Sequence, residues 1–141
     1  MQLIDAARQA PSGHNTQSWK FKIVEPKDYD KIEGMFVQDF VLKAPMIILC
    51  AANPLMYKKT DNDQDNQIRA IRDLSISTAF LTLRAEELGL GTCYVGWVDR
   101  EKIKLALDIP AEYVVPYVIT VGYPKEKRNR SPKKEVEEIL F

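Results

Sequence analysis

Residues 65–88 read DNQIRAIRDLSISTAFLTLRAEEL and form the longest helix-like stretch of the 141-residue chain. Asp residues that can cap a helix precede it, and Gly89 follows it as a stop signal. Its apolar residues spread around most of the circumference among small polar residues, as in a helix that is covered on more than one side. A domain of this length does not easily bury a helix all round. Two explanations stay open: a second copy of the chain covers part of the helix, or the helix is the centre of a compact monomer.

The segments that flank this helix alternate between strand and helix patterns. The run APMIILCAA at 44–52 is continuously apolar and indicates a central strand, and Pro116 predicts an irregularity or an edge in a later strand. No internal repeat or low-complexity linker interrupts the chain, so we expect one domain over residues 1–141. Further strands are expected at 19–24, 91–95 and 113–122, and further helices at 2–9, 26–36, 99–107 and 133–140.

The composition argues against several classes of function. The 20 basic and 20 acidic residues cancel, so no overall field attracts nucleic acid or an anionic membrane. No apolar run approaches the roughly 20 residues that span a bilayer, and the first residues do not resemble a secretory signal, so we expect a cytoplasmic protein. Cys50 and Cys93 lie in apolar stretches without partners at metal-ligand spacing, which argues against a zinc site or a disulfide framework.

A self-sufficient catalytic set is not evident. His14 is the one histidine, so no Ser-His-Asp or Cys-His arrangement can be assembled without it. Neither a GxGxxG nor a GxxxxGK[ST] phosphate loop occurs. Chemistry more demanding than binding would therefore depend on an organic cofactor.

Two motifs could bind a flat ligand. Residues 10–19, APSGHNTQSW, form a polar loop between an expected helix and an expected strand. This loop is either a helix stop and turn, or a set of donors and acceptors from Ser12, Gly13 and Asn15 for a heteroaromatic ligand. Residues 89–97, GLGTCYVGW, contain three glycines, which suit a tight turn or the close approach of a ligand to the backbone.

A third motif is strongly basic. Residues 125–134, KEKRNRSPKK, contain six basic residues and one acidic residue, a local charge of +5. A solvated charge run is one explanation. The other is a phosphate site, because Arg128 and Arg130 in an extended segment would point the same way and could hold a dianion.

The order of these motifs resembles that of the flavin-dependent nitroreductase family. The resemblance covers nearly the whole chain and rests on residues 10–19, on LRAEELGLGTCYVGW at 83–97, on VGYP at 121–124 and on RNR at 128–130. It implies an α+β fold with a mixed sheet between two layers of helices, an obligate homodimer, and FMN in each of two interface sites. By position, it implies that Pro11, Ser12, Gly13 and Asn15 contact the FMN ring from the partner subunit, that Tyr94, Val95 and Gly96 line the ring near N5, that Arg128 and Arg130 hold the phosphate, and that His14 lies at the substrate mouth.

The resemblance also implies an activity. Hydride would pass from NAD(P)H to the flavin and then to a small electron-poor acceptor such as a nitroaromatic or a quinone. Two features depart from the family pattern: the APSG loop begins only nine residues after the start, without the usual Arg-rich segment that grips the phosphate, and Ser18 replaces a proline, which would loosen the loop slightly. The alternative is therefore a degenerate flavin-binding or interaction protein of the same dimeric fold, with weak or no reductase activity.

Overall fold

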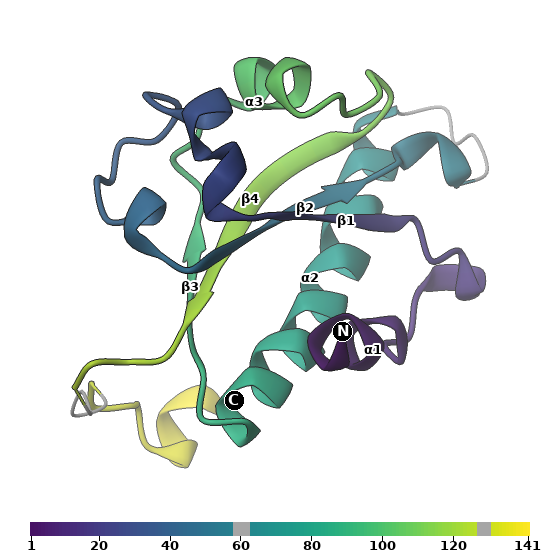
Figure 1. Cartoon of the computed structure of the whole chain (residues 1–141). Coiled ribbons are helices and arrows are strands. Elements are labelled where there is room, and N and C mark those ends of the chain that lie inside the picture. Colours follow the sequence, from purple (N-terminus) through teal and green to yellow (C-terminus); the bar gives the residue numbers. More distant parts are fainter. Residues whose placement is uncertain (58–62, 127–130) are drawn as a thin grey trace.

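The structure is a computed structural model that describes residues 1–57, 63–126 and 131–141. Its helices and strands follow one another in an order close to that expected from the sequence (Figure 1). The α-helices are α1 (Gln2–Arg8), α2 (Asp63–Glu87) and α3 (Arg100–Ala106), and the strands are β1 (Trp19–Val24), β2 (Met46–Ala52), β3 (Gly91–Val95) and β4 (Val114–Gly122). Short 3₁₀ helices lie at Gly13–Asn15, Pro26–Ile32, Val41–Lys43, Pro54–Met56 and Val136–Ile139.

The four described strands form one sheet in the order β1-β2-β4-β3. Every neighbouring pair in it is antiparallel, so the expected mixed sheet is wrong for these strands. The reason is the position of β4. Strands β2 and β3 run in the same direction and are connected through α2, but β4 lies between them and pairs antiparallel with both.

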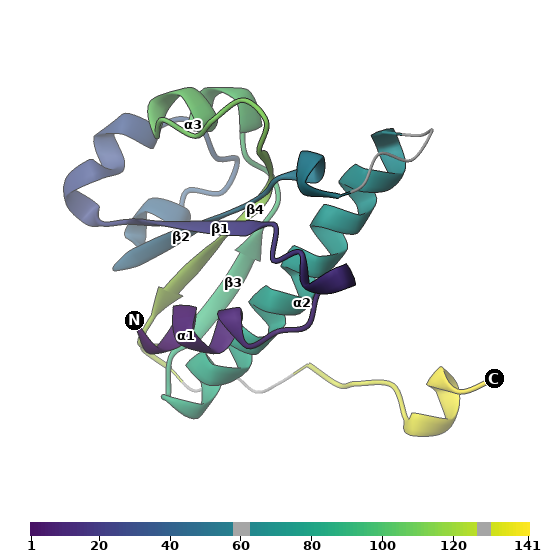
Figure 2. The same ribbon diagram turned by 90° about the vertical axis from the view of Figure 1, so that its right-hand side faces the viewer.

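Helices cover both faces of the sheet, which confirms the expected three layers (Figures 1 and 2). Helices α1 and α2 pack on one face, while α3 and the 3₁₀ helix Pro26–Ile32 pack on the other. Strand β2 shows why both faces are apolar, because successive side chains along a strand point to opposite sides. Its residues Ile48, Cys50 and Ala52 belong to the core on the α2 side, and Ile47, Leu49 and Ala51 belong to the core on the α3 side.

Helix α2 is buried along one side only. Ala70, Leu74 and Leu81 are fully buried against the sheet and α1. Phe80 and Leu83, by contrast, are 41% and 73% exposed in the single chain. No helix within the described ranges is long and apolar enough to cross a membrane.

Two expected α-helices are 3₁₀ helices instead. The first ends at Ile32 rather than at residue 36, because Gly34 adopts a left-handed conformation with φ of 73°. The second covers only Val136–Ile139, with Glu135 rather than Ser131 at its N-cap. Its residues are all exposed, and so short a helix is marginal without a surface to pack on.

The irregularity expected at Pro116 is present, although β4 is a central strand. Cys50 pairs with Tyr117 and Ala52 pairs with Val114, so two residues of β4 lie opposite Ala51. Proline is tolerated at such a bulge because a ladder hydrogen bond is already missing there.

Gly122 provides a test of the packing at the end of β4. A Cβ atom at this position would lie 2.7 Å from Cδ and 2.8 Å from Cγ of Pro45, closer than real side chains approach. We expect Gly122→Ala to lower the free energy of unfolding by about 1–3 kcal/mol, because a rigid proline ring must move. Urea unfolding measures this change. Gly91→Ala is the matched control, since its Cβ would meet its nearest atom at an ordinary 3.5 Å, and an equal loss in both variants would contradict the account.

Candidate functional site

The loop between α1 and β1 carries the first predicted motif and has an unusual backbone. His14, Asn15 and Gln17 all adopt left-handed conformations, with φ of 52°, 54° and 49°. Non-glycine residues rarely adopt this region unless the surrounding structure holds them there. Within the loop, the Gln17 N–H donates to Ser12 Oγ at 3.0 Å, and Gln17 Nε2 donates to Asn15 Oδ1 at 3.1 Å. These bonds fix the loop internally, and neither of them uses the Asn15 NH₂ group.

A buried carboxylate of α2 holds the loop from outside. The side chain of Asp73 is 2% exposed. Its Oδ2 accepts the backbone N–H of Gly13 at 2.8 Å and the hydroxyl of Tyr57 at 2.7 Å, and its Oδ1 accepts Arg72 Nε at 3.1 Å. The Gly13 N–H is therefore bonded within the protein.

The same contacts control the ionisation of Asp73. Burial acts to raise its pKa, but the hydrogen bonds from Tyr57, Gly13 and Arg72 outweigh burial, and the pKa is lowered overall. The carboxylate is thus ionised at neutral pH. It contributes a fixed negative charge beneath the loop.

This lowered pKa predicts a pH dependence of stability. A carboxyl whose pKa is lower in the folded than in the unfolded chain stabilises the fold above the unfolded pKa, and this stabilisation is lost as pH falls through the folded pKa. We expect the difference in free energy of unfolding between wild type and Asp73→Asn to shrink between about pH 7 and about pH 3. Urea unfolding at several pH values measures this. A difference that stays constant or grows as pH falls would contradict the assignment.

Ser18 also belongs to this cluster. Its hydroxyl lies 3.2 Å from the Tyr57 hydroxyl, and its carbonyl oxygen accepts the N–H of Asn53 at 3.0 Å. Because the Tyr57 proton points to Asp73, Ser18 is the donor to Tyr57. The side chain is 1% exposed, so Ser18 is held in place at this end of the loop.

The second motif lies at the end of β3. Val95 is 2% exposed and belongs to the core on the α3 side, so its side chain cannot line a ligand site and only its backbone could. Tyr94 points to the opposite face and is 44% exposed. Gly96 follows, and among the described residues a Cβ there would meet the Pro116 carbonyl oxygen at 3.9 Å as its nearest neighbour.

Tyr94 is supported by a polar network under α2. Its ring meets that of Tyr117 edge to face, with centroids 5.1 Å apart. The Tyr117 hydroxyl lies 2.8 Å from Thr78 Oγ1 and donates to Ser75 Oγ at 3.3 Å. Burial raises the pKa of Tyr117 to about 12, so this hydroxyl stays protonated at neutral pH and serves as a structural donor.

The two motifs do not meet within one chain. The loop leads into β1 at one edge of the sheet, whereas Tyr94 and Gly96 lie at the other edge, beyond β2 and β4 (Figure 1). Three strand spacings alone separate these edges by roughly 14 Å. His14 is exposed in the loop, on the β1 side. Arg128 and Arg130 lie outside the described residues.

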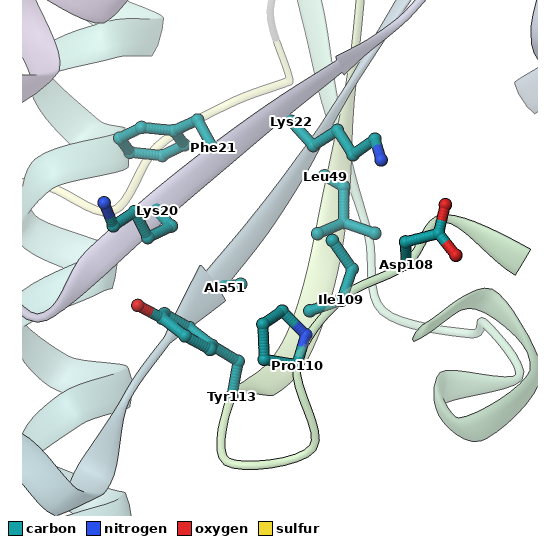
Figure 3. Close-up of a pocket in the computed structure, with 9 residues that line it drawn as sticks. All are labelled: Lys20, Phe21, Lys22, Leu49, Ala51, Asp108, Ile109, Pro110 and Tyr113. Carbon is teal, nitrogen blue, oxygen red and sulfur yellow. The ribbon is translucent and has the colours of Figure 1, made fainter. Parts of the chain in front are cut away.

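Two hollows accompany these segments. An open recess of about 500 Å³ lies beside Gly96, between residues 34–37 and 96–99. A cavity of about 390 Å³ lies on the α3 side of β1, and Lys20, Lys22, Asp108 and Tyr113 line it (Figure 3). The cavity at Lys20 contains none of the predicted site residues, so the recess at Gly96 is the better candidate for a ligand.

Sequence reasoning missed Asp73 and Tyr57, and it gave Trp97 no role of its own although Trp97 ends the second motif. Trp97 is 69% exposed beside Gly96 and borders the recess. Asp73 could have been found from helical register, because it falls on the same side of the helix as Ala70 and Ser77, which are apolar or small. An acidic residue on the buried side of a helix requires a partner.

Comparisons with known proteins identify relatives of the same fold. The model of the Nitroreductase family matches residues 1–38 and 30–123. A protein of Archaeoglobus fulgidus, whose name proposes an NADH dehydrogenase or NAD(P)H nitroreductase, is 29% identical over 133 residues, which cover 90% of this chain and 73% of that protein. A solved nitroreductase family protein of Streptococcus pneumoniae has the same fold, with a TM-score of 0.89, 22% identity, and coverage of 99% of this chain and 86% of that chain. An FMN-dependent nitroreductase of Clostridium difficile R20291 is similar at 26% identity and a TM-score of 0.78, with coverage of 99% and 84%.

Proposed function

Because the chain belongs to the nitroreductase family, we propose that it is an FMN-dependent oxidoreductase that moves electrons from NAD(P)H to small electron-poor acceptors such as nitroaromatics or quinones. The observation that carries this proposal is the placement of the loop and of Gly96 at opposite edges of one sheet. A site that uses both motifs then needs two chains. The FMN dependence stated for the C. difficile relative and the NAD(P)H use proposed for the A. fulgidus relative support the choice of cofactor and donor.

The recess beside Gly96 suits one face of a flavin ring. Its walls include Met35, Phe36 and Trp97, which offer an apolar and aromatic surface. The missing side chain of Gly96 leaves space next to the β3 backbone. A planar heteroaromatic ring in the recess can therefore lie close to the main chain at Gly96. Tyr94 and the backbone of Val95 precede Gly96 and are not part of the recess wall, so their contact with the ring rests on the resemblance to the family.

The loop of the partner subunit would supply the polar contacts. The Asn15 NH₂ group and the Ser12 hydroxyl proton are among the donors that take part in none of the described hydrogen bonds of the loop. Such groups can bind the carbonyl and nitrogen atoms of a flavin edge. Pro11 and Gly13 would contribute shape, and His14 would lie at the substrate mouth. The phosphate would be held by Arg128 and Arg130.

A homodimer follows from the same proposal. Phe80 and Leu83 lie near one another on α2 and are exposed in the single chain. The C-terminal segment 131–141 extends away from the sheet and exposes Val136, Ile139, Leu140 and Phe141 (Figure 2). Exposed apolar side chains on α2 and on the C-terminal segment are typical of surfaces that a partner covers. A second copy of the chain is the partner that would complete the flavin site.

The chain's own residues hold and orient the reactants in this proposal. The chemistry that FMN supplies when bound is two-electron transfer between NAD(P)H and the acceptor. The recess and the partner loop would exclude water from the ring and present donors to it. No protein acid or base is required, and the high pKa of Tyr117 makes it unsuited to act as one at neutral pH.

The test is reconstitution of the purified full chain with excess FMN, followed by removal of free flavin. We expect a retained flavin spectrum and oxidation of NADH or NADPH that depends on a quinone or nitroaromatic acceptor. Free FMN at the same concentration is the control for uncatalysed turnover. A folded protein that retains no flavin and oxidises no NAD(P)H would contradict the proposal and favour the interaction protein.

A further inference from the structure

We propose that Asp73 is a positioning residue that sets the conformation of the flavin-contacting loop 12–17; the flavin part of this inference rests on the proposed function. Asp73 is far from this loop in sequence and lies in the middle of α2. Its side chain is almost fully buried, although it carries a charge at neutral pH. Burying a carboxylate is costly unless hydrogen bonds compensate it, so its three donors define its role.

Those donors connect Asp73 to both ends of the loop. At the first end, the Gly13 N–H donates directly to Oδ2 at 2.8 Å. At the second end, Ser18 lies 3.2 Å from the Tyr57 hydroxyl, which in turn donates to the same oxygen at 2.7 Å. One carboxylate oxygen thus holds the residues that flank 14–17.

The loop needs such an anchor because its own contacts are local. The remaining hydrogen bonds of residues 12–17, in the part of the chain that the structure describes, stay within the loop. His14, Asn15 and Gln17 meanwhile occupy the left-handed region, which costs free energy for non-glycine residues. The few hydrogen bonds inside the loop must offset the cost of three left-handed residues, and they are not enough to hold the loop in one conformation. The hydrogen bonds to Asp73 of α2 supply the additional stabilisation.

The consequence for binding is a population effect. Ser12 and Asn15 present their donors to the flavin only when the loop has this conformation. If removal of the anchor lowers the fraction of competent loops to about a tenth, the apparent Kd for FMN rises about tenfold. Asp73 would act on the flavin through the loop without touching it.

The experiment compares three variants of the full chain with wild type. Asp73→Ala removes the anchor, and Asp73→Asn keeps one oxygen that can accept the Gly13 N–H. Tyr57→Phe removes the hydroxyl that links Asp73 to Ser18, but leaves the bond between Asp73 and the Gly13 N–H in place. Ser77→Ala is the matched control, because Ser77 is also a buried polar residue of α2 but donates to the Ala7 carbonyl in α1 at 2.8 Å. The readouts are the Kd for FMN, the melting temperature and the hydrogen exchange of the Gly13 amide.

We expect Asp73→Ala to raise the Kd for FMN about tenfold or more and to expose the Gly13 amide to exchange while amides of α2 stay protected. Asp73→Asn should raise the Kd less than Asp73→Ala does and should keep part of the protection of the Gly13 amide. Tyr57→Phe should give a Kd between those of wild type and Asp73→Ala. Ser77→Ala should lower the melting temperature without changing the Kd. The inference is overturned if Asp73→Ala and Ser77→Ala change the Kd equally at equal loss of melting temperature, or if Gly13 exchange is unchanged in Asp73→Ala. If wild type itself binds no FMN, the proposed function fails, while the exchange data still decide whether Asp73 sets the loop.

Discussion

Replacing both Arg128 and Arg130 by alanine is expected to raise the Kd for FMN by about two to four decades. These residues lie outside the described part of the structure, and the expectation comes from their i, i+2 spacing in a segment of charge +5. A charge-assisted hydrogen bond contributes about 1.5–3 kcal/mol, so loss of two corresponds to roughly 3–6 kcal/mol. Titration of the apoprotein with FMN measures the change, and the melting temperature without FMN should stay the same.

The matched control removes two charges from the same basic stretch. Lys133 and Lys134 are described and exposed, and Lys133→Ala with Lys134→Ala lowers the local charge by the same amount. We expect a much smaller rise in Kd from this pair, because long-range attraction is screened by salt. If the two double variants weaken binding equally, the arginines act through general charge and do not grip the phosphate.

Leu83→Glu is expected to convert the proposed dimer into monomers and to abolish retention of FMN. Leu83 is 73% exposed on α2 in the single chain, so the substitution does not disturb the core of one chain. Within a dimer interface it would bury an unpaired carboxylate, which costs several kcal/mol and weakens association by about three decades or more. Light scattering measures the mass, and absorbance of the same sample measures bound flavin.

Leu105→Glu is the control for this prediction. Leu105 is similarly exposed, at 79%, but it lies on α3 in the opposite helical layer. We expect this variant to stay dimeric and to retain FMN. A dimeric Leu83→Glu protein, or equal dissociation of both variants, would show that the open side of α2 is not the interface.

The sequence predicted the strands and the long helix well because their signals are local. Strand β3 falls at Gly91–Val95 as expected, and α2 extends over Asp63–Glu87 against an expected 65–88. Periodicity and turn residues suffice for such elements. The segments 26–36 and 133–140 were predicted less well, because their helical patterns are short and Gly34 or the lack of a packing surface decides the outcome.

The candidate site could be predicted only in part. The residues of the loop were identified, but their left-handed backbone was not, because it depends on a carboxylate 60 residues away from Gly13 in sequence. The sequence also did not indicate that the Gly13 N–H bonds to Asp73 or that the Val95 side chain packs in the core. Tertiary contacts decide which groups face a ligand. The residues that make these contacts do not recur at a fixed spacing in the sequence, so no sequence pattern reveals them.

The central claim is that each flavin site combines the loop of one chain with residues 94–96 and the arginines of the other. Mixed dimers test it most directly. One parent carries Ser12→Ala with Asn15→Ala, and the other carries Arg128→Ala with Arg130→Ala, so each homodimer binds FMN weakly at both sites. In a mixed dimer, one site contains both pairs of substitutions and the other site contains neither pair. The account therefore predicts that each mixed dimer binds one FMN with wild-type affinity. If mixing restores no tight site, each flavin site is built from a single chain and the account is wrong.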